Sequence, residues 1–181
     1  MEIFTGGAPV PTSAVSRKVH GGAGTFDINL PLVPISGAVG IECRIGAVAG
    51  AHQEVITFAS PVTVSGVAVT SGTGSATFSG SGTTVITVNL TGVTDVQRLG
   101  VTLQNVSDGT NTGDVMVPMG VLSGDTGANG SVSAADVGQT KSQSGQPVGA
   151  GNFREDVNSN GSINAADVGL VKSKSGNTLP P

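Results

Sequence analysis

Apolar and polar residues alternate along most of the first two thirds of the chain. In residues 83–90, for example, Ile86, Val88 and Leu90 alternate with side chains that are mostly polar. A period of two residues predicts a β-strand with one buried face. Similar strand-like runs lie at residues 13–20, 24–32, 39–46, 54–59, 62–70, 75–80, 98–105 and 114–120.

Turn-forming segments separate these runs at short intervals. They include SGTGS at residues 71–75, SGSG at residues 79–82 and SDGTNTG at residues 107–113. The chain has 29 glycines and only 3% aromatic residues, which is typical of a mainly β protein with many tight turns. We therefore expect an immunoglobulin-like antiparallel β-sandwich over residues 13–120. Because the chain has one cysteine and no tryptophan, the Cys…Trp…Cys spacing of antibody domains is missing, and the prediction concerns the architecture alone.

Residues 1–12 do not follow this pattern. They contain two prolines and show no helical period, which predicts an extended arm. We hypothesise that this arm adds to an exposed sheet edge of a neighbouring copy, which is one of the recurring ways in which chains are linked. An arm that covers an edge of its own sheet is the alternative.

The last third of the chain contains an internal repeat. The segments DTGANGSVSAADVGQTKSQSG at residues 125–145 and DVNSNGSINAADVGLVKSKSG at residues 156–176 are identical at 13 of 21 positions. Self-similarity of this kind indicates a repeated supersecondary unit. Residues 121–181 are therefore predicted to form a small module of their own.

The second copy of the repeat has oxygen-bearing groups at the spacing of a calcium-binding loop. Ca²⁺ takes about six to eight oxygen ligands, and a 12-residue loop supplies them from positions 1, 3, 5, 7, 9 and 12 around a glycine at position 6. In residues 156–167, Gly161 occupies position 6, and Ile163 at position 8 is expected to point inward. The predicted ligands are Asp156, Asn158, Asn160, the Ser162 carbonyl, Asn164 and Asp167.

The first copy fits the same pattern less completely. Its predicted ligands are Asp125, Asn129, the Ser131 carbonyl, Ser133 and Asp136. Position 3 is Gly127, which has no side-chain oxygen, so we expect weaker binding of Ca²⁺ at this site. Turns rich in Asn, Asp and Gly also form without a metal, but two copies in the same frame favour two calcium sites.

The loop spacing and the aspartate at position 12 resemble the type I dockerin repeat. In that family, two such loops are each followed by a short helix, and the pair forms a small calcium-dependent unit. The resemblance covers residues 121–176, and the whole layout is also similar to modules at the C-terminal ends of large secreted bacterial proteins. Loop positions 10 and 11 of dockerins contact a cohesin partner, and here they are Ala134-Ala135 and Ala165-Ala166.

Other patterns that would indicate chemistry are weak. His20 and His52 are the only histidines, and their spacing does not suggest a transition-metal site. Cys43 is predicted to be a buried structural thiol, with a nucleophile paired to His52 or a bridge to another chain as the alternatives. The acidic residues outside the loops show no pairing typical of glycosidases. We therefore expect that the protein is not an enzyme.

The charge of the chain restricts its partners. The net charge is −4 and the eight Lys and Arg residues are scattered, which argues against a nucleic-acid surface. No run of 18 apolar residues is present, so no membrane span is predicted. The N-terminus lacks the layout of a signal peptide, so we expect either that a signal has been removed or that the chain is part of a longer secreted protein.

These patterns together predict a secreted, calcium-stabilised structural protein that lies outside the cell or on its surface. We expect a self-assembling filament or surface-layer subunit, linked through residues 1–12, with copies of itself as partners. The alternative is a dockerin-like binding module that docks a cohesin-type receptor on another protein.

Overall fold

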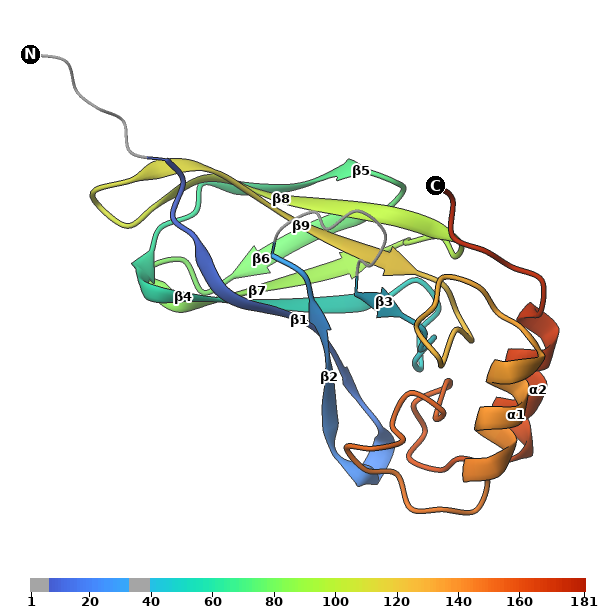
Figure 1. Cartoon of the computed structure of the whole chain (residues 1–181). Coiled ribbons are helices and arrows are strands. Elements are labelled where there is room, and N and C mark those ends of the chain that lie inside the picture. The colour runs from blue at the N-terminus through green and yellow to red at the C-terminus, as the bar shows by residue number, and fades with distance from the viewer. Residues whose placement is uncertain (1–6, 33–39) are drawn as a thin grey trace, which may run out of the picture.

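The protein is mainly β, and its computed structural model describes residues 7–32 and 40–181. A sandwich of two sheets is followed by two short helices (Figure 1), which confirms the predicted order of these parts. The strands are β1 (Pro11–Val19), β2 (Thr25–Leu30), β3 (Ile41–Glu42), β4 (His52–Val62), β5 (Gly66–Ser71), β6 (Ser75–Ser79), β7 (Thr83–Thr91), β8 (Gln97–Ser107) and β9 (Thr112–Val121). The helices are α1 (Ala134–Gln143) and α2 (Ala165–Lys174), and a single 3-10 turn lies at Gly21–Ala23.

The two sheets differ in size and in one strand direction. One sheet has five strands in the order β2-β1-β4-β7-β6, and the other has four in the order β3-β9-β8-β5. Neighbouring strands are antiparallel except β3 and β9, which run parallel. The expectation of an antiparallel sandwich is therefore wrong for this pair, because the chain enters β3 in the direction of β9 and no hairpin joins the two strands.

Apolar side chains from both sheets fill the space between them. In β7, Ile86 and Val88 are fully buried, whereas Val85 on the opposite face is 38% exposed. The alternation predicted for residues 83–90 is thus confirmed. The same core contains, among others, Ala14, Leu30, Ile56, Phe58, Leu90, Val101, Leu103, Val117 and Met119.

Residues 39–46 were expected to form a strand; residue 39 lies outside the described residues, and of residues 40–46 only Ile41 and Glu42 form β3. Side chains on both faces of this segment are buried, since Cys43 is 0% and Arg44 is 1% exposed. The C-terminal region supplies part of the cover, because the Gly124 N–H donates to the Cys43 carbonyl at 2.9 Å. The predicted burial of the Cys43 thiol is confirmed, and this burial raises its pKa to about 11.

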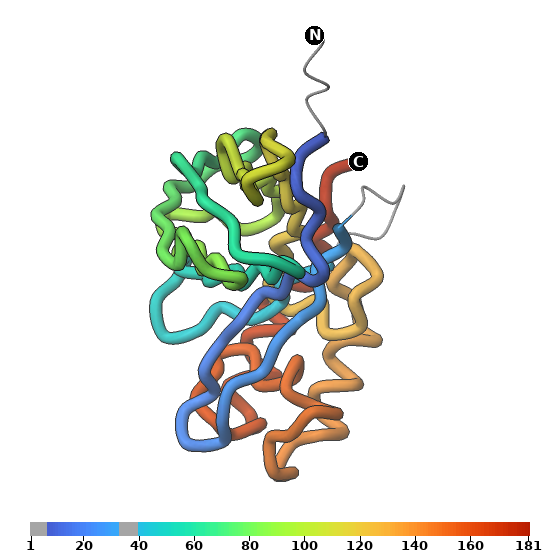
Figure 2. The backbone as a smooth tube through the Cα atoms, turned by 90° about the vertical axis from the view of Figure 1, so that its left-hand side faces the viewer, coloured from blue at the N-terminus to red at the C-terminus, as the bar shows by residue number. Residues whose placement is uncertain are grey.

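The C-terminal region has a small apolar core that it shares with the sandwich. The helices α1 and α2 lie together below the sandwich in Figure 1, and the segment between them faces the β1–β2 hairpin in Figures 1 and 2. The core consists of Ile41, Leu122, Val132, Val157, Val171 and Leu179, of which Ile41 belongs to β3. Because this cluster includes a residue of the sandwich, the C-terminal region is packed onto it directly. The division into residues 13–120 and 121–181 stays a prediction.

The two halves of the repeat hold each other through backbone hydrogen bonds. The Gly145 N–H, just after α1, donates to the Ile163 carbonyl at 2.9 Å. The Gly176 N–H, just after α2, donates to the Val132 carbonyl at 2.8 Å. Both accepting residues are at loop position 8 and are 2% exposed, as expected for Ile163. Each loop is thus fixed to the end of the other helix.

The predicted N-terminal arm is only partly described. Residues 1–6 lie outside the described residues, and β1 already begins at Pro11. Ala8 lies against β9, since a Cβ atom placed on Gly113 would be 2.9 Å from the Ala8 Cβ. A role of residues 1–12 in linking copies stays a prediction.

Within residues 7–32 and 40–181, neither helix has the length and apolar character that crossing a membrane requires.

Candidate metal centre

The two 12-residue loops have the same backbone shape. Ala128 and Ser159, at position 4 of their loops, both have a φ of 55°. Gly130 and Gly161, at position 6, have φ values of 85° and 90°. Residues with a side chain rarely adopt such φ angles, so glycine at position 6 permits the sharp turn on which the sequence prediction depends. The repeat in sequence is therefore also a repeat in backbone conformation.

Loop two, residues 156–167, brings its two carboxylates into the protein interior. Asp156 and Asp167 are both 0% exposed. Asp156 accepts the backbone N–H groups of positions 5 and 6 at 3.1 and 2.8 Å. Asp167 accepts those of positions 3 and 9 at 3.2 and 3.0 Å. The first and last residues of the loop thus face inward, as the ligand pattern predicts.

The asparagine side chains among the other predicted ligands of loop two accept hydrogen bonds from the backbone. Asn158 Oδ1 accepts the Asn160 N–H, and Asn160 Oδ1 accepts the Ser162 N–H, each at 2.9 Å. Asn164 Oδ1 accepts the Ala166 N–H and so caps the start of α2. An amide oxygen has two lone pairs, so each of these oxygens retains capacity for an ion. Their role as ligands, and that of the Ser162 carbonyl, stays a prediction.

Loop one, residues 125–136, repeats the arrangement of its carboxylates. Asp125 is 0% and Asp136 is 1% exposed. Asp125 accepts the backbone N–H groups of positions 5 and 6 at 3.1 and 2.8 Å. Asp136 accepts those of positions 3 and 9, both at 2.9 Å. The same four backbone donors therefore orient the carboxylates in both loops.

Loop one has fewer side-chain oxygens than loop two. Asn129 Oδ1 accepts both the N–H and the hydroxyl of Ser131. Ser133 Oγ accepts the Ala135 N–H and caps α1. At position 3, Gly127 offers only its N–H, which is used by Asp136. The structure thus gathers the predicted residues of loop one around a gap at position 3.

Each loop holds two buried carboxylates that repel each other. Burial raises the pKa of Asp125, and the negative charge of Asp136 raises it further. Hydrogen bonds from the backbone lower this pKa but do not outweigh the rise. Burial likewise raises the pKa of Asp167, with a further contribution from Asp156. No Lys or Arg side chain of the described residues forms an ion pair with a loop carboxylate, and Asp156 instead takes a hydrogen bond from His20. A cation between the carboxylates would remove this repulsion.

The turn between β1 and β2 lies directly on loop two, where the blue hairpin meets the orange segment in Figures 1 and 2. His20 Nδ1 donates to Asp156 Oδ2 at 2.8 Å, and both side chains are 0% exposed. The backbones also touch, because a Cβ on Gly161 would lie 2.8 Å from the His20 carbonyl oxygen. A Cβ on Gly21 would clash with the Asn160 carbonyl oxygen. The sandwich therefore covers loop two through a close backbone contact.

A buried polar network holds His20 from within the sandwich. Arg44 Nη1 donates to His20 Nε2 at 3.1 Å, so the ring hydrogen of His20 lies on Nδ1, which donates to Asp156. Arg44 also pairs with Glu42 at 2.7 Å, and both side chains are 0% exposed. Burial alone raises the pKa of Glu42, but the charge and hydrogen bonds of Arg44 outweigh it and lower the pKa to about 2. These contacts join β3, the hairpin and loop two.

Arg154, in the connection between the repeats, plays a similar part for loop one. Its Nε donates to the Thr126 carbonyl at 2.9 Å, and its Nη2 donates to the Asp125 carbonyl at 3.0 Å. The same Nη2 donates to the Ile41 carbonyl of β3 at 3.1 Å. Loop one is thus tied to β3 by one side chain of the C-terminal region.

The sequence pattern identified the loops but missed the residues that support them. His20 stands 136 residues before Asp156, and no periodicity or spacing links the two. Arg44 and Arg154 were counted only among the scattered basic residues. No local signal would have found these contacts, because each depends on how distant segments pack.

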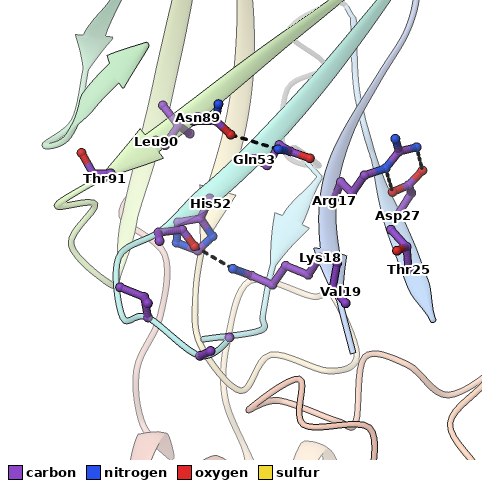
Figure 3. A pocket seen from close by; sticks show the side chains of 14 residues that line it. Arg17, Lys18, Val19, Thr25, Asp27, His52, Gln53, Asn89, Leu90 and Thr91 are labelled. Atoms are coloured by element: carbon purple, nitrogen blue, oxygen red, sulfur yellow. Dashed lines mark hydrogen bonds and ion pairs between the residues drawn. The ribbon is translucent and has the colours of Figure 1, made fainter. Parts of the chain in front are cut away.

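An open pocket lies apart from the loops, beside β1, β4 and β7 (Figure 3). Its polar side chains largely bond to one another, since Arg17 pairs with Asp27 at 2.7 Å and Gln53 Nε2 donates to Asn89 Oδ1 at 2.9 Å. Lys18 Nζ donates to a backbone carbonyl at 2.8 Å. This pattern offers no assembled nucleophile and base among the described residues, and the expectation that the chain is not an enzyme stays a prediction.

Comparison with known proteins gives one distant structural match. No family model matches the sequence, and no curated protein matches it. The crystal structure of the S-layer protein SbsC domains 4 and 5 matches with a TM-score of 0.28 and 18% sequence identity, over 55% of this chain and 59% of that chain. This chain thus covers less than two thirds of the matched chain. A likeness of this size does not establish a family or a function.

Proposed function

We propose that this chain is an extracellular structural protein in which two Ca²⁺ ions hold the C-terminal loops against the β-sandwich. The observation that carries the proposal is the burial of four aspartate carboxylates in two loops of the same shape: Asp125, Asp136, Asp156 and Asp167. A buried carboxylate without a cation is costly. Among the described residues, no Lys or Arg side chain forms an ion pair with any of the four, and their side-chain partners are His20 and the hydroxyls of Thr126 and Ser133.

The donor groups of the loops suit calcium. They are carboxylate, amide and carbonyl oxygens, which hard cations prefer and softer transition metals do not. No three His, Cys, Asp or Glu side chains cluster as a metal site in the described part of the chain. Each loop therefore depends on its asparagine and carbonyl oxygens to complete a shell of about six to eight ligands. When bound, the ion supplies positive charge between the two aspartates, which joins the two ends of the loop.

The number of carboxylates points to an extracellular setting. Each loop offers two carboxylates, and its other predicted ligands are neutral. Fewer charged ligands mean weaker binding, in the range of about 10⁻⁴ to 10⁻³ M that is typical of extracellular calcium modules. Such sites fill outside the cell, where calcium is abundant.

The calcium proposal is tested by melting the full chain in excess chelator and in about 10 to 100 mM CaCl₂, which is a hundredfold excess over a Kd of about 10⁻⁴ to 10⁻³ M. Each ion that binds only the folded state adds about 2.7 kcal/mol to the free energy of unfolding at a hundredfold excess over Kd. We expect Ca²⁺ to raise the melting temperature and an equal concentration of Mg²⁺ to raise it much less. Equal melting temperatures in chelator and in Ca²⁺ would overturn the proposal.

The structural role includes assembly with further copies through residues 1–12. Because β1 begins at Pro11, removing residues 1–6 leaves every described strand in place. Size-exclusion chromatography of the full and shortened chains in CaCl₂ tests this part of the proposal. We expect oligomers of the full chain that are lost on shortening, and monomers in both samples would reject assembly through the arm.

A second candidate function is docking of a cohesin-type receptor. It is favoured by a shallow groove between α1 and α2 that is lined by the same four positions of each repeat. The lining residues are Ala134, Val137, Lys141 and Ser144 with Ala165, Val168, Lys172 and Ser175. Binding of the full chain to a panel of purified cohesins tests this function, and the variant Val137→Glu is expected to abolish any binding through the groove.

A further inference from the structure

The two loops differ at two positions in a way that suggests compensation. Position 3 is Gly127 in loop one and Asn158 in loop two. The residue three places after the final loop aspartate is Gln139 in α1 and Leu170 in α2. Loop one lacks a side-chain oxygen at position 3, and the helix that follows it carries one at Gln139. In the other copy, Leu170 packs against the apolar core of the C-terminal region.

The side chain of Gln139 lies beside the gap at position 3. A Cβ atom placed on Gly127 would be 3.3 Å from Asp136 Oδ1 and 3.8 Å from Gln139 Oε1. Residues three apart on a helix share one face, so Gln139 and Asp136 are neighbours on α1. The Gln139 oxygen thus lies within one side-chain length of position 3, close to a carboxylate of the site.

Glu155 fixes the orientation of the Gln139 amide. Gln139 Nε2 donates to Glu155 Oε1, which leaves the Gln139 oxygen free to face loop one. Glu155 is 3% exposed, and its Oε2 is buried without a hydrogen-bond partner among the described residues. A buried oxygen without a partner is rare in folded proteins and indicates a missing ion or water nearby. The equivalent residue before loop one is Gly124, so loop two has no matching carboxylate from the other repeat.

We infer that Gln139 is an additional ligand of the first calcium site and takes the place of the missing side chain at position 3. Glu155 is a positioning residue that holds the Gln139 amide. The inference rests on the proposed function. The Gln139 carbonyl oxygen is a neutral hard donor of the same kind as an asparagine oxygen at position 3. Site one thus takes a ligand from α1, whereas site two takes its ligands from its own loop.

The two sites can be followed separately by NMR. The Gly130 and Gly161 N–H groups donate to Asp125 and Asp156 at 2.8 Å, so each amide signal reports its own site. A titration of the ¹⁵N-labelled full chain with CaCl₂, with the Gly130 and Gly161 signals fitted independently, gives the affinity of each site. In Gln139→Leu, we expect the affinity reported by Gly130 to fall about tenfold and that reported by Gly161 to stay unchanged.

Matched variants separate ligation from a general effect on folding. The double variant Gly127→Asn/Gln139→Leu gives loop one the pattern of loop two, and we expect it to recover the affinity lost in Gln139→Leu. Leu170→Gln places an amide oxygen on α2 beside loop two, which already has Asn158 at position 3. We therefore expect no gain in the calcium affinity that Gly161 reports. Glu155→Leu, which frees the Gln139 amide, is expected to weaken site one less than Gln139→Leu does. Melting in chelator checks that the variants fold.

The outcomes distinguish this inference from the proposed function. If Gly130 responds to Ca²⁺ equally in the unmodified chain and in Gln139→Leu, Gln139 is not a ligand and the proposed function stands. A double variant that folds but stays weak also overturns the ligand role. If neither glycine signal responds to Ca²⁺ in the unmodified chain, the proposed function itself fails.

Discussion

Loop one and loop two share a backbone shape, a pair of buried aspartates and the same four backbone donors, but they are held by different parts of the molecule. Loop one is bound mainly by Arg154 of its own C-terminal region, which donates to two of its carbonyls. Loop two is bound by His20 of the sandwich, behind which stand Arg44 and Glu42. One repeated sequence therefore occupies two environments.

The two environments show how a duplicated motif is joined to a larger fold. A metal loop needs only local residues to shape its backbone, since glycine at position 6 and the aspartates at both ends suffice. The groups that orient its ligands from outside are set by whatever packs against it. Loop two faces the β1–β2 hairpin and acquires His20, whereas loop one faces α1 and acquires Gln139. We expect the two sites to respond differently to the same kind of change.

The largest expected difference comes from removing the first aspartate of each loop. Asp156→Ala leaves His20 and two backbone donors without their acceptor in a buried site, and we expect a loss of about 4 kcal/mol in the free energy of unfolding. Asp125→Ala removes the acceptor of two backbone donors only, and we expect a loss of about 2 kcal/mol. Chemical denaturation in excess chelator measures both values, because the metal then contributes to none of the chains. Equal losses would contradict the idea that the sandwich anchors loop two.

A smaller difference is expected from the buried pair behind His20, and it depends on pH. The pKa of Glu42 is about 2 in the folded chain and 4.5 ordinarily, so its stabilising effect is complete above pH 4.5 and is lost as the pH falls towards 2. A shift of this size corresponds to about 3 kcal/mol. Glu42→Gln should therefore destabilise the chain by about this amount at pH 6, with the gap to the unmodified chain closing in acid.

Glu54→Gln provides a control of opposite sign for that experiment. Burial raises the pKa of Glu54 to about 8, so the unmodified chain should lose stability as the pH rises from 4.5 towards 8, and the variant should not. Denaturation in chelator between pH 3 and 8 measures both variants without interference from the metal. A gap for Glu42→Gln that does not change with pH would show that Arg44 does not hold the carboxylate ionised.

The smallest of these effects is expected from His20 itself. His20→Ala removes one hydrogen bond to Asp156 but keeps both aspartates of loop two, and we expect a loss of about 2 kcal/mol in stability. As a group outside the ligand shell, it should lower the calcium affinity of site two about tenfold and leave site one unchanged. The Gly161 and Gly130 amide signals measure the two affinities. His52→Ala is the matched control, since His52 is buried in the sandwich and bonds to neither loop among the described residues.

Features that depend on neighbours along the chain were predictable from the amino-acid sequence. Alternation fixed β7 and the face it buries, because successive side chains of a strand point in opposite directions. The repeat fixed two loops of the same shape, because glycine at position 6 and the flanking aspartates act within twelve residues. The resemblance to dockerin repeats implied a short helix after each loop, and in the structure Ser133 and Asn164 cap these helices from within the motif.

The surroundings of these elements depend on long-range packing, which local patterns do not encode. The parallel pairing of β3 with β9 and the contact of His20 with Asp156 both join segments that no local pattern relates. Residues 39–46 show the reason most clearly. Their alternation is that of a strand, yet both faces are buried, because the C-terminal region packs on the side that an isolated sandwich would leave to solvent.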